Sequence, residues 1–282
     1  MDILTVKEAA LERLEHCTKE VSSRVVQAVR TVYRQRDHDE RPEAIGTCFL
    51  LQDGPRKYLV TAAHIFDFAE ENSIYVAGEI SLVRLNGAFW VTPKIDGSRR
   101  EDKHDVAFQL LSEDMVGKLG AVLYLNADEI SLNRGSMDGR MYIAMGYPSS
   151  RNKPNQVDLP RKHVKARAWT YASTAFTEPS KYYATGASES VHILIKHSHK
   201  YSRTFGGHRT QSVRPQGASG GVLIDLGLPD PNSLRPGVPC IGKLAGMLIE
   251  KHNDHDAIVA VKIEVILGAM RGALVKTDCS VD

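Results

Sequence analysis

Short apolar runs separated by turn residues dominate the chain from residue 46 to residue 125. These runs are TCFLL (47–51), KYLVTAA (57–63), SIYVA (73–77), SLVRL (81–85), AFWVT (88–92) and DVAFQLL (105–111). Runs of this length are typical of β-strands. Their regular spacing favours a six-stranded antiparallel barrel over an alternation of strands and helices.

A second set of apolar runs occupies the other half of the chain. It comprises Met141–Ala144, Val164–Tyr171, Val191–Lys196, Gly221–Ile224, Ile241–Ile249 and Ala257–Val261. We expect these runs to form a second barrel that faces the first across a cleft. The fold class is therefore all-β, with the first barrel at about 24–130 and the second at about 138–262.

Helical periodicity is confined to the two ends. Thr5 and Glu8 have the spacing of a capping box, and apolar residues then recur at helical intervals. This pattern predicts an amphipathic helix over 6–21 within an N-terminal segment 1–23, which packs on the barrel or docks a partner. Val25–Tyr33 alternates and predicts the first strand. At the other end, Lys262–Arg271 predicts a helix that stops at Gly272 and leaves 273–282 as a tail.

Composition adds limits rather than a function. Of the 282 residues, 42% are hydrophobic and 25% are charged, and the net charge is +2, which suits an ordinary globular protein without a strong charge bias. The first 20 residues carry four glutamates instead of an apolar core, which argues against a signal peptide. Without the roughly 18 consecutive apolar residues of a membrane helix, we expect a cytoplasmic protein with no membrane contact.

The cysteines and histidines do not indicate a metal site. Cys17, Cys48, Cys240 and Cys279 lack CxxC spacing, so we expect four free thiols and neither a zinc ribbon nor a disulfide framework. Two histidine clusters, 197–199 and 252–255, fit solvated turns better than a zinc site, which needs three or four ligands. We therefore expect no metal and no cofactor.

The stretch Gly217-Ala218-Ser219-Gly220-Gly221 precedes the apolar run Val222–Ile224. Glycines on both sides of a serine allow a sharp turn that exposes the hydroxyl and aims successive N–H groups at one point. This geometry suits a nucleophile and its oxyanion hole. The same residues also suit a plain hairpin turn.

A serine nucleophile needs a base and an acid to orient it. His64 follows the apolar run YLVTAA, and Asp105 opens the run DVAFQLL. Each segment also has a structural interpretation, with His64 as a core histidine and Asp105 as a turn cap. The chain order His, Asp, Ser, each at the end of a strand, favours the catalytic interpretation.

Together these segments resemble a chymotrypsin-fold (trypsin-like) serine peptidase of the bacterial, HtrA-like kind. The matching text is GTCFL (46–50), YLVTAAH, HDVAFQLL, GYP (146–148), GASGG and LAGML (244–248), and it runs from about 25 to 270. The resemblance implies two six-stranded Greek-key barrels within a peptidase domain 24–272. It further implies that His64 is the general base, Asp105 orients it and Ser219 attacks, with the N–H groups of Gly217 and Ser219 forming the oxyanion hole.

The chain departs from this pattern at individual positions and in its extent. Ala218 replaces the aspartate that pairs with a new amino terminus in secreted zymogens of the family. Ile65 replaces the cysteine that would pair with Cys48, so no disulfide is expected there. The resemblance covers the catalytic half of HtrA-like enzymes alone, and we expect no PDZ domain.

Substrate contacts are also implied by the resemblance. Val213, six residues before Ser219, corresponds to the floor of the primary pocket, and Ile249-Glu250-Lys251 corresponds to its wall. Since Val213 offers no counter-charge, we expect cleavage after apolar residues rather than after Arg or Lys. Alternation along the strand directs the neighbours of Glu250, not Glu250, into the cleft.

Charge is uneven along the second half. No Asp or Glu occurs between Ser190 and Ile224, and residues 151–167 are also rich in Lys and Arg. Such segments are solvated loops or attract an acidic protein; we do not expect nucleic acid, because no accompanying motif is present. The predicted function is an intracellular serine endopeptidase that acts on protein substrates under the control of a regulatory protein partner or an ordering loop. The alternative is a silent peptidase-fold scaffold.

Overall fold

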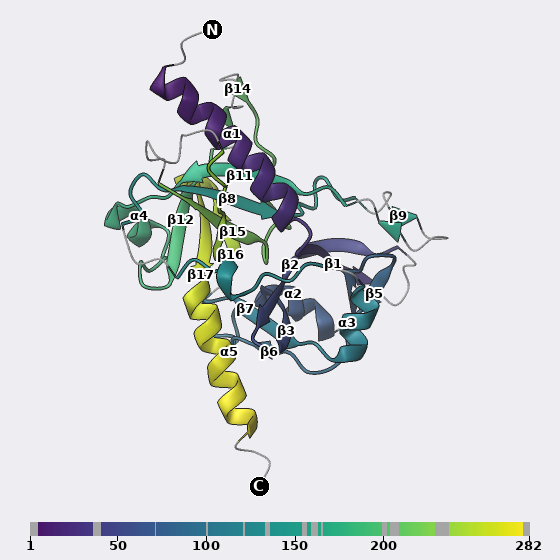
Figure 1. Ribbon diagram of the computed structural model, residues 1–282. Helices are drawn as coiled ribbons and strands as arrows, with labels where there is room; N and C mark the ends of the chain where they lie inside the picture. The colour runs from purple at the N-terminus through teal and green to yellow at the C-terminus, as the bar shows by residue number, and fades with distance from the viewer. Residues whose placement is uncertain are drawn as a thin grey trace.

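Two antiparallel sheets form the framework of the chain, with a helix at each end (Figure 1). A computed structural model describes residues 5–35, 41–70, 72–99, 101–120, 122–132, 136–153, 157–158, 163–164, 166–198, 202–203, 209–228 and 237–278. None of the described helices combines the length and apolar composition that crossing a bilayer requires.

The first sheet has the order β5-β4-β1-β2-β3-β7-β6. Its strands are β1 (Val29–Gln35), β2 (Glu43–Asp53), β3 (Arg56–Ala62), β4 (Ser73–Ala77), β5 (Leu82–Arg84), β6 (Trp90–Val91) and β7 (Val106–Leu110). The sheet has seven strands rather than six, because β1 joins the six runs predicted after residue 46. Cys48–Leu51 and Tyr58–Thr61 pair through the centre of this sheet and are fully or almost fully buried.

The second sheet has the order β11-β8-β15-β16-β17-β12. Its strands are β8 (Met141–Gly146), β11 (Trp169–Thr174), β12 (His192–Lys196), β15 (Val222–Gly227), β16 (Lys243–His252) and β17 (Ala257–Lys262). An antiparallel bridge between Ala175 and Ile195 brings the two outer strands of this sheet together. Two short hairpins lie outside it: β9 (Val157–Asp158) with β10 (His163–Val164), and β13 (Ser202–Arg203) with β14 (Arg209–Thr210).

The predicted strand Val164–Tyr171 is wrong, since Val164 belongs to a hairpin and β11 begins only at Trp169. Asn152 explains the interruption. Its side-chain oxygen accepts from the Arg167 N–H at 2.7 Å, and its amide donates to the Arg167 carbonyl at 3.2 Å. With both backbone groups of Arg167 bonded to a side chain, the segment before Trp169 does not pair as a strand.

The N-terminal helix α1 spans Val6–Val25 and begins with the predicted capping box of Thr5 and Glu8. It continues four residues past the predicted end, so the expected strand at Val25 starts only at Val29. Val21 and Val25 are buried in the main core, and this contact favours the helical continuation. Figure 1 shows α1 lying across β8 of the second sheet, which it contacts.

The C-terminal helix α5 spans Ile263–Asp278 and passes through Gly272, where we expected it to stop. A glycine inside a helix costs only about 1 kcal/mol relative to alanine, and Ala273 beyond it still packs against the core. Part of the expected tail is therefore helical. The shorter helices are α2 (Ala63–Phe66), α3 (Glu113–Leu119) and α4 (Pro179–Ala184), with 3-10 turns η1 (Asp67–Glu70), η2 (Ala127–Glu129) and η4 (Asn253–His255).

The main hydrophobic core crosses from one sheet to the other. Phe49 and Val60 of the first sheet belong to the same buried cluster as Met145 and Met247 of the second. Burying each such side chain stabilises the fold by about 1.5–3 kcal/mol relative to leaving it exposed. The packing between the two halves is therefore part of the core.

The cysteines differ from the expectation of four free thiols. Cys17 of α1 and Cys240 form a disulfide, with 5.1 Å between their Cα atoms. Both lie in segments for which the sequence showed no pairing signal, and they become neighbours only because α1 packs on the second half. Cys48 is a free thiol, completely buried in β2. Cys279 lies outside the described residues.

Candidate active site

His64 sits on the first turn of α2, directly after β3, and Asp105 directly precedes β7. These two strands pair as neighbours, and the Ala63 N–H donates to the Asp105 carbonyl at 3.0 Å. The Asp105 carboxylate then makes two bonds to His64: Oδ1 accepts from the backbone N–H at 2.8 Å, and Oδ2 lies 2.6 Å from Nδ1. The imidazole is therefore fixed by one carboxylate, with Nε2 left for another partner.

The conformation of Asp105 is uncommon, with φ at +45°. A residue other than glycine rarely adopts this left-handed region, although aspartate tolerates it better than most. The backbone and side-chain bonds to Ala63 and His64 hold it there. A strained residue at the point where an acid meets a histidine is a feature that functional sites share.

The pKa of His64 is raised above its usual value by opposing influences. Burial lowers the pKa, but the hydrogen bond and negative charge of Asp105 outweigh it, and the charge of Asp67 adds to the rise. The imidazolium form is thus stabilised by a neighbouring carboxylate, as a general base requires when it takes up a proton.

Two other acids lie near His64 and are bonded to Arg99. Asp67 pairs with the Arg99 guanidinium at 3.0 Å, and Asp102 pairs with it at 2.9 Å. Burial raises the pKa of both carboxyl groups, yet the bonds that they accept, from Arg99 in each case and from Thr92 to Asp102, bring each pKa below its usual value. Among these three acids, Asp105 is the one that bonds to His64.

The loop around Ser219 is a close backbone turn. Gly217 has φ +88° and Gly220 has φ +82°. A Cβ on Gly220 would lie 1.9 Å from the Thr47 carbonyl oxygen, and one on Gly217 would lie 2.7 Å from the Ser149 nitrogen. Both positions therefore require glycine for two independent reasons, conformation and space.

The hydrogen-bond donors of this loop divide into two sets. The N–H groups of Ala218, Gly220 and Gly221 donate to carbonyls at 2.7–2.8 Å. Within the described part of the chain, the N–H groups of Gly217 and Ser219 donate to no protein acceptor. The two groups that the sequence assigns to an oxyanion hole are the ones with spare bonding capacity.

The Ser219 hydroxyl donates to the Ile249 carbonyl at 2.8 Å. Ile249 is at a β-bulge, where the register between β16 and β17 shifts between Leu248 and Glu250. A bulge leaves the extra residue outside the regular ladder, so its carbonyl is free to accept a side chain. The hydroxyl is thus held in its own half of the molecule and not by His64.

Thr47 joins the two halves at the loop. Its N–H donates to the Ser219 carbonyl at 2.9 Å, and its hydroxyl donates to the Gly217 carbonyl at 2.9 Å. The same hydroxyl accepts from the Tyr147 N–H at 2.9 Å. One buried side chain on β2 of the first sheet therefore fixes both the serine loop and the segment after β8.

A cleft of about 440 Å³ opens beside His64. His64, Arg99, Asp102 and Asp105 line it from the first half, and His192, Ile249, Glu250 and His252 line it from the second. Ser219 and Val213 are not among its lining residues. Ile249 borders the cleft with His64 and bonds to Ser219, so it is the shared neighbour of His64 and the Ser219 hydroxyl.

No protein-family model and no curated protein matches the sequence, but solved structures do match. The serine endoprotease from Yersinia pestis aligns with a TM-score of 0.52 and 14% identity over 90% of this chain, which spans 65% of that protein's chain. The structure of GrC aligns with a TM-score of 0.52 and 13% identity over 88% of this chain and 94% of that chain. The chain has the chymotrypsin fold. The prediction of two antiparallel barrels with a helix at each end is confirmed.

Within this chymotrypsin fold, the predicted pocket residues do not all meet. Val213 packs with Tyr171 against the smaller buried cluster of the second half. Glu250 instead lines the cleft beside His64, and its carboxylate lies 2.8 Å from His252 Nε2. The neighbour Ile249 lines the cleft as expected, but Glu250 was expected to turn away from it and does not, because the bulge at Ile249 interrupts the alternation. The side chain of Lys251 lies outside the described part of the structure.

His192 is a cleft residue that the sequence did not single out. It opens β12, is almost completely buried, and its Nε2 lies 2.7 Å from the Lys103 carbonyl, two residues before Asp105. Its Nδ1 accepts from the Ser188 N–H at 2.9 Å, so Nε2 carries the proton. Burial lowers the pKa of His192, which favours this neutral form. A histidine before an apolar strand gives no sequence signal for such a contact between the two halves of the chymotrypsin fold.

The remaining candidates lie away from the serine loop or outside the described residues. His197 is buried beside Trp169 and Tyr171, with Nε2 3.1 Å from the Ser212 hydroxyl. His252 lies at the end of β16 next to Glu250. Much of the two basic segments falls outside the described residues: 154–156, 159–162, 165, 199–201 and 204–208 are not described. The interpretation of those segments stays a prediction.

Proposed function

We propose that this protein is an intracellular serine endopeptidase that hydrolyses protein substrates through an acyl-enzyme on Ser219. The observation that carries the proposal is the His64 imidazole, oriented by Asp105 at 2.6 Å, in a cleft whose wall residue Ile249 also holds the Ser219 hydroxyl at 2.8 Å. The chymotrypsin fold that the chain shares with the Yersinia serine endoprotease is consistent with it.

In the proposed first step, Ser219 Oγ leaves the Ile249 carbonyl and donates to His64 Nε2. Nδ1 is already bonded to Asp105, so Nε2 is the nitrogen that accepts the proton. Oγ then forms a bond to the substrate carbonyl carbon, and the electron pair of the C=O bond moves to oxygen. The raised pKa of His64 suits this proton transfer, because the charge on Asp105 stabilises the imidazolium that forms.

The developing oxyanion is proposed to accept from the N–H groups of Gly217 and Ser219. Their lack of protein acceptors among the described residues supports this role. In enzymes from which one such donor has been removed, the activation barrier rises by about 2.7–4 kcal/mol. The His64 imidazolium then gives its proton to the leaving amine. Water next attacks the acyl-enzyme, with His64 again accepting a proton, and Ser219 is released.

The proposed specificity is for an apolar residue before the cleaved bond. Val213 is half-buried against the smaller cluster of the second half and brings no charge to the site. Glu250 lies in the cleft beside His64, with its carboxylate 2.8 Å from His252 Nε2. We assign it together with Ile249 and Lys251 to contacts with the substrate backbone or a neighbouring side chain. A cytoplasmic location stays part of the proposal, although the Cys17–Cys240 disulfide is a bond that is uncommon in a reducing compartment.

One observation favours the alternative of a silent scaffold. The Ser219 hydroxyl is bonded to Ile249 and must rotate before it meets His64. If nothing induces that rotation, the cleft binds without turnover. A partner or an ordering event that releases the hydroxyl is therefore the proposed form of control.

A fluorophosphonate probe separates the two functions. The intact chain should be labelled on Ser219, and both Ser219→Ala and His64→Ala should lose the label. Ser190→Ala, which removes an exposed serine before β12, is the matched control and should retain it. If the intact chain is not labelled and the probe leaves its thermal unfolding profile unchanged, the scaffold would be the remaining function.

A further inference from the structure

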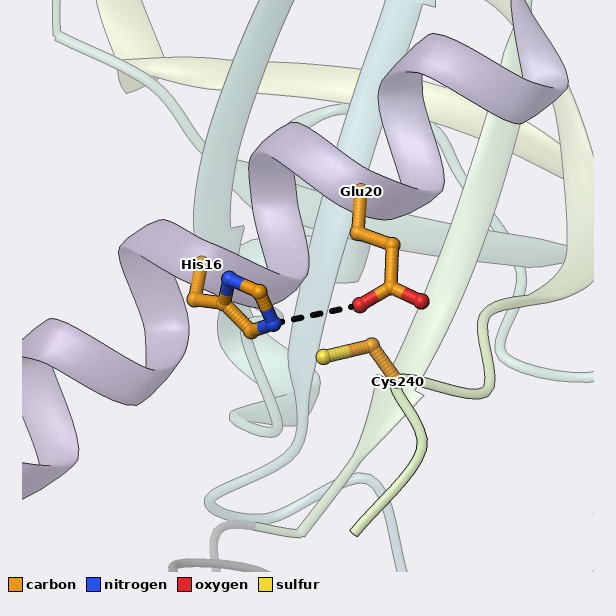
Figure 2. Close-up of side chains that lie close together, drawn as sticks. All are labelled: His16, Glu20 and Cys240. Carbon is orange, nitrogen blue, oxygen red and sulfur yellow. Dashed lines mark ion pairs between the residues drawn. The ribbon is translucent and has the colours of Figure 1, made fainter. Parts of the chain in front are cut away.

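Four potential metal ligands meet where α1 crosses the segment before β16. Figure 2 shows His16 and Glu20 on α1 with their side chains beside Cys240. His16 Nε2 lies 3.3 Å from Glu20 Oε2, and the ligand atoms of His16, Glu20 and Cys240 all lie within 4.8 Å of one another. Cys17, the neighbour of His16, is bonded to Cys240.

The helix places three of these residues on one side. Successive residues turn by about 100°, so His16, Cys17 and Glu20 fall within about 100° of the helix circumference. The fourth residue, Cys240, comes from a segment more than 200 positions away in the chain. A cluster assembled from a helix and a distant segment differs from the His252–His255 turn, whose ligands come from one hairpin.

We propose that His16, Cys17, Glu20 and Cys240 bind one zinc ion when both thiols are reduced, and that the disulfide is the oxidised form of the same site. Two thiolates, an imidazole and a carboxylate are the donors that zinc takes in proteins. A tetrahedron with metal–ligand bonds of about 2.0–2.1 Å has a nitrogen–oxygen edge of about 3.3 Å. His16 and Glu20 already have that separation.

The sulfur atoms need only a small movement. Reduction breaks the S–S bond, and zinc bonds of about 2.3 Å place the two sulfurs about 3.8 Å apart. The 5.1 Å between the Cα atoms lies within the usual disulfide range, so the change requires rotation of the two side chains and little backbone movement.

Ion entry is favourable, and the cationic side chains near the site are bonded to other groups: Arg13, one turn before Cys17, donates to the Val238 carbonyl. The side chains of His16 and Glu20 are 64% and 53% exposed, so a hydrated ion reaches them from solvent. The nearest lysine of the helix, Lys19, pairs with Glu15 at 2.7 Å. Its charge is thereby partly compensated on another side of α1.

Oxidation of the zinc form balances with a hydroperoxide as the oxidant. Each thiolate loses one electron, the two sulfurs form the S–S bond, and the O–O bond of the hydroperoxide is cleaved by the two electrons. Two protons from solvent complete the reduced products, which are water and the corresponding alcohol or a second water. The zinc ion leaves because a disulfide is no longer a thiolate donor.

Both forms tie α1 to β16. Between Cys240 and the strand, a Cβ on Gly242 would lie 2.4 Å from Val21 Cγ1, and Arg24 donates to the Gly242 carbonyl at 3.1 Å. β16 continues to Ile249, which borders the cleft and accepts the Ser219 hydroxyl. The zinc or the disulfide therefore anchors the chain just before the start of β16, and Ile249 near the end of the same strand belongs to the candidate active site.

The test measures zinc in the full-length chain after thiol reduction, zinc loading and removal of free metal. We expect one zinc per chain, and none after hydrogen peroxide. Cobalt in place of zinc should give thiolate charge-transfer absorption and the intense visible bands of a tetrahedral site. His16→Ala and Glu20→Gln should each weaken zinc binding at least about tenfold, since even partners of metal ligands contribute that much.

Two substitutions serve as matched controls. Glu12→Gln changes an exposed carboxylate of the same helix, and Cys279→Ser removes the C-terminal cysteine. Both should retain one zinc. Because His16 and Glu20 are exposed, their variants are expected to fold, and far-UV circular dichroism checks this. The proposal is overturned if the reduced chain binds no more zinc than Cys17→Ser/Cys240→Ser, or if His16→Ala and Glu20→Gln bind it as tightly as the unaltered chain.

Discussion

The two halves of the molecule prepare their reactive groups in different ways. In the first half, His64 and Asp105 lie at the ends of paired strands, and their mutual bonds are complete without any residue of the second half. In the second half, Ser219 lies on a loop whose position depends on Thr47 of the first half. His64 is thus fixed within one sheet, whereas the loop that carries Ser219 is fixed by the contact between the sheets.

This difference separates two kinds of damage. Substitutions in the first half should change how His64 carries a proton and leave the serine loop in place. Substitutions at the contact between the halves should move the loop relative to His64 and leave the His64–Asp105 pair intact. Activity, stability and pH dependence then respond to different residues.

The largest effect is expected for Ser219→Ala and His64→Ala. Each should lower kcat/KM for a peptide substrate by about 10⁴-fold or more, because nucleophile and base act as a unit. Steady-state hydrolysis of a peptide library measures it. Combining the two substitutions should cost little more than either alone, and additive losses would argue against one shared step.

Asp105→Asn should lower kcat by about 10⁴-fold, because an amide cannot stabilise the imidazolium. Asp102→Asn is the comparison within the same loop, since its carboxylate bonds to Thr92 and Arg99 rather than to His64. It should reduce thermal stability more than kcat. The opposite ranking of the two variants in a kcat measurement would assign the acid to Asp102.

Thr47→Val should affect the contact between the halves. It removes a hydroxyl that bonds to Gly217 and Tyr147, leaving buried groups unpaired at a cost of about 1–3 kcal/mol in the free energy of unfolding. Displacement of the serine loop should also lower kcat/KM by up to about 100-fold. Thr47→Ser retains the hydroxyl and should recover most of both. If Thr47→Ser recovers the stability but not the activity, the position of the serine loop does not depend on this hydrogen bond.

The smallest effect is a shift in pH dependence. Since the pKa of His64 is raised, kcat/KM should reach half its maximum above the usual histidine value of about 6.5. Asp67→Asn removes a charge that contributes to the rise and should move this midpoint to lower pH. A pH profile of kcat/KM for both proteins measures it, and an unmoved midpoint would contradict the electrostatic influence of Asp67.

The raised pKa of His64 also affects the stability of the fold, and this effect falls with rising pH whereas the activity rises. A group whose pKa is higher in the folded state binds its proton more tightly there, so its stabilising contribution is complete below the unfolded pKa. That contribution disappears as pH rises through the folded value. Activity that depends on neutral His64 should therefore appear over the pH range in which this stabilisation is lost.

Local patterns predicted the strands well, because buried strands require runs of apolar residues that can be seen in the sequence. Tyr58–Ala62 and Val106–Leu110 are apolar runs, and both are strands whose pairing brings His64 and Asp105 together. Glycine around Ser219 likewise has a local cause, the positive φ at Gly217 and Gly220. These features depend on residues that are close in the chain.

Other features were not predictable because they depend on distant partners. The interruption before Trp169 requires Asn152, the disulfide requires α1 to lie on the second half, and the bulge at Ile249 requires a register shift against β17. The contact between His192 and Lys103 joins two halves that no local pattern relates. Helix ends were missed by a few residues for the same reason, because Val25 is held by tertiary packing.

The buried thiol of Cys48 can report how often the first sheet opens transiently. Burial raises the thiol pKa to about 12, although the charge of Arg30 acts in the opposite direction, so almost no thiolate exists at neutral pH. An alkylating reagent reacts with thiolate, and it must also reach the centre of β2. With Cys17 and Cys240 joined and Cys279 replaced, Cys48 is the one remaining thiol of the sequence. The rate of its alkylation would therefore measure how often the first sheet opens, a quantity that neither hydrolysis nor thermal unfolding provides.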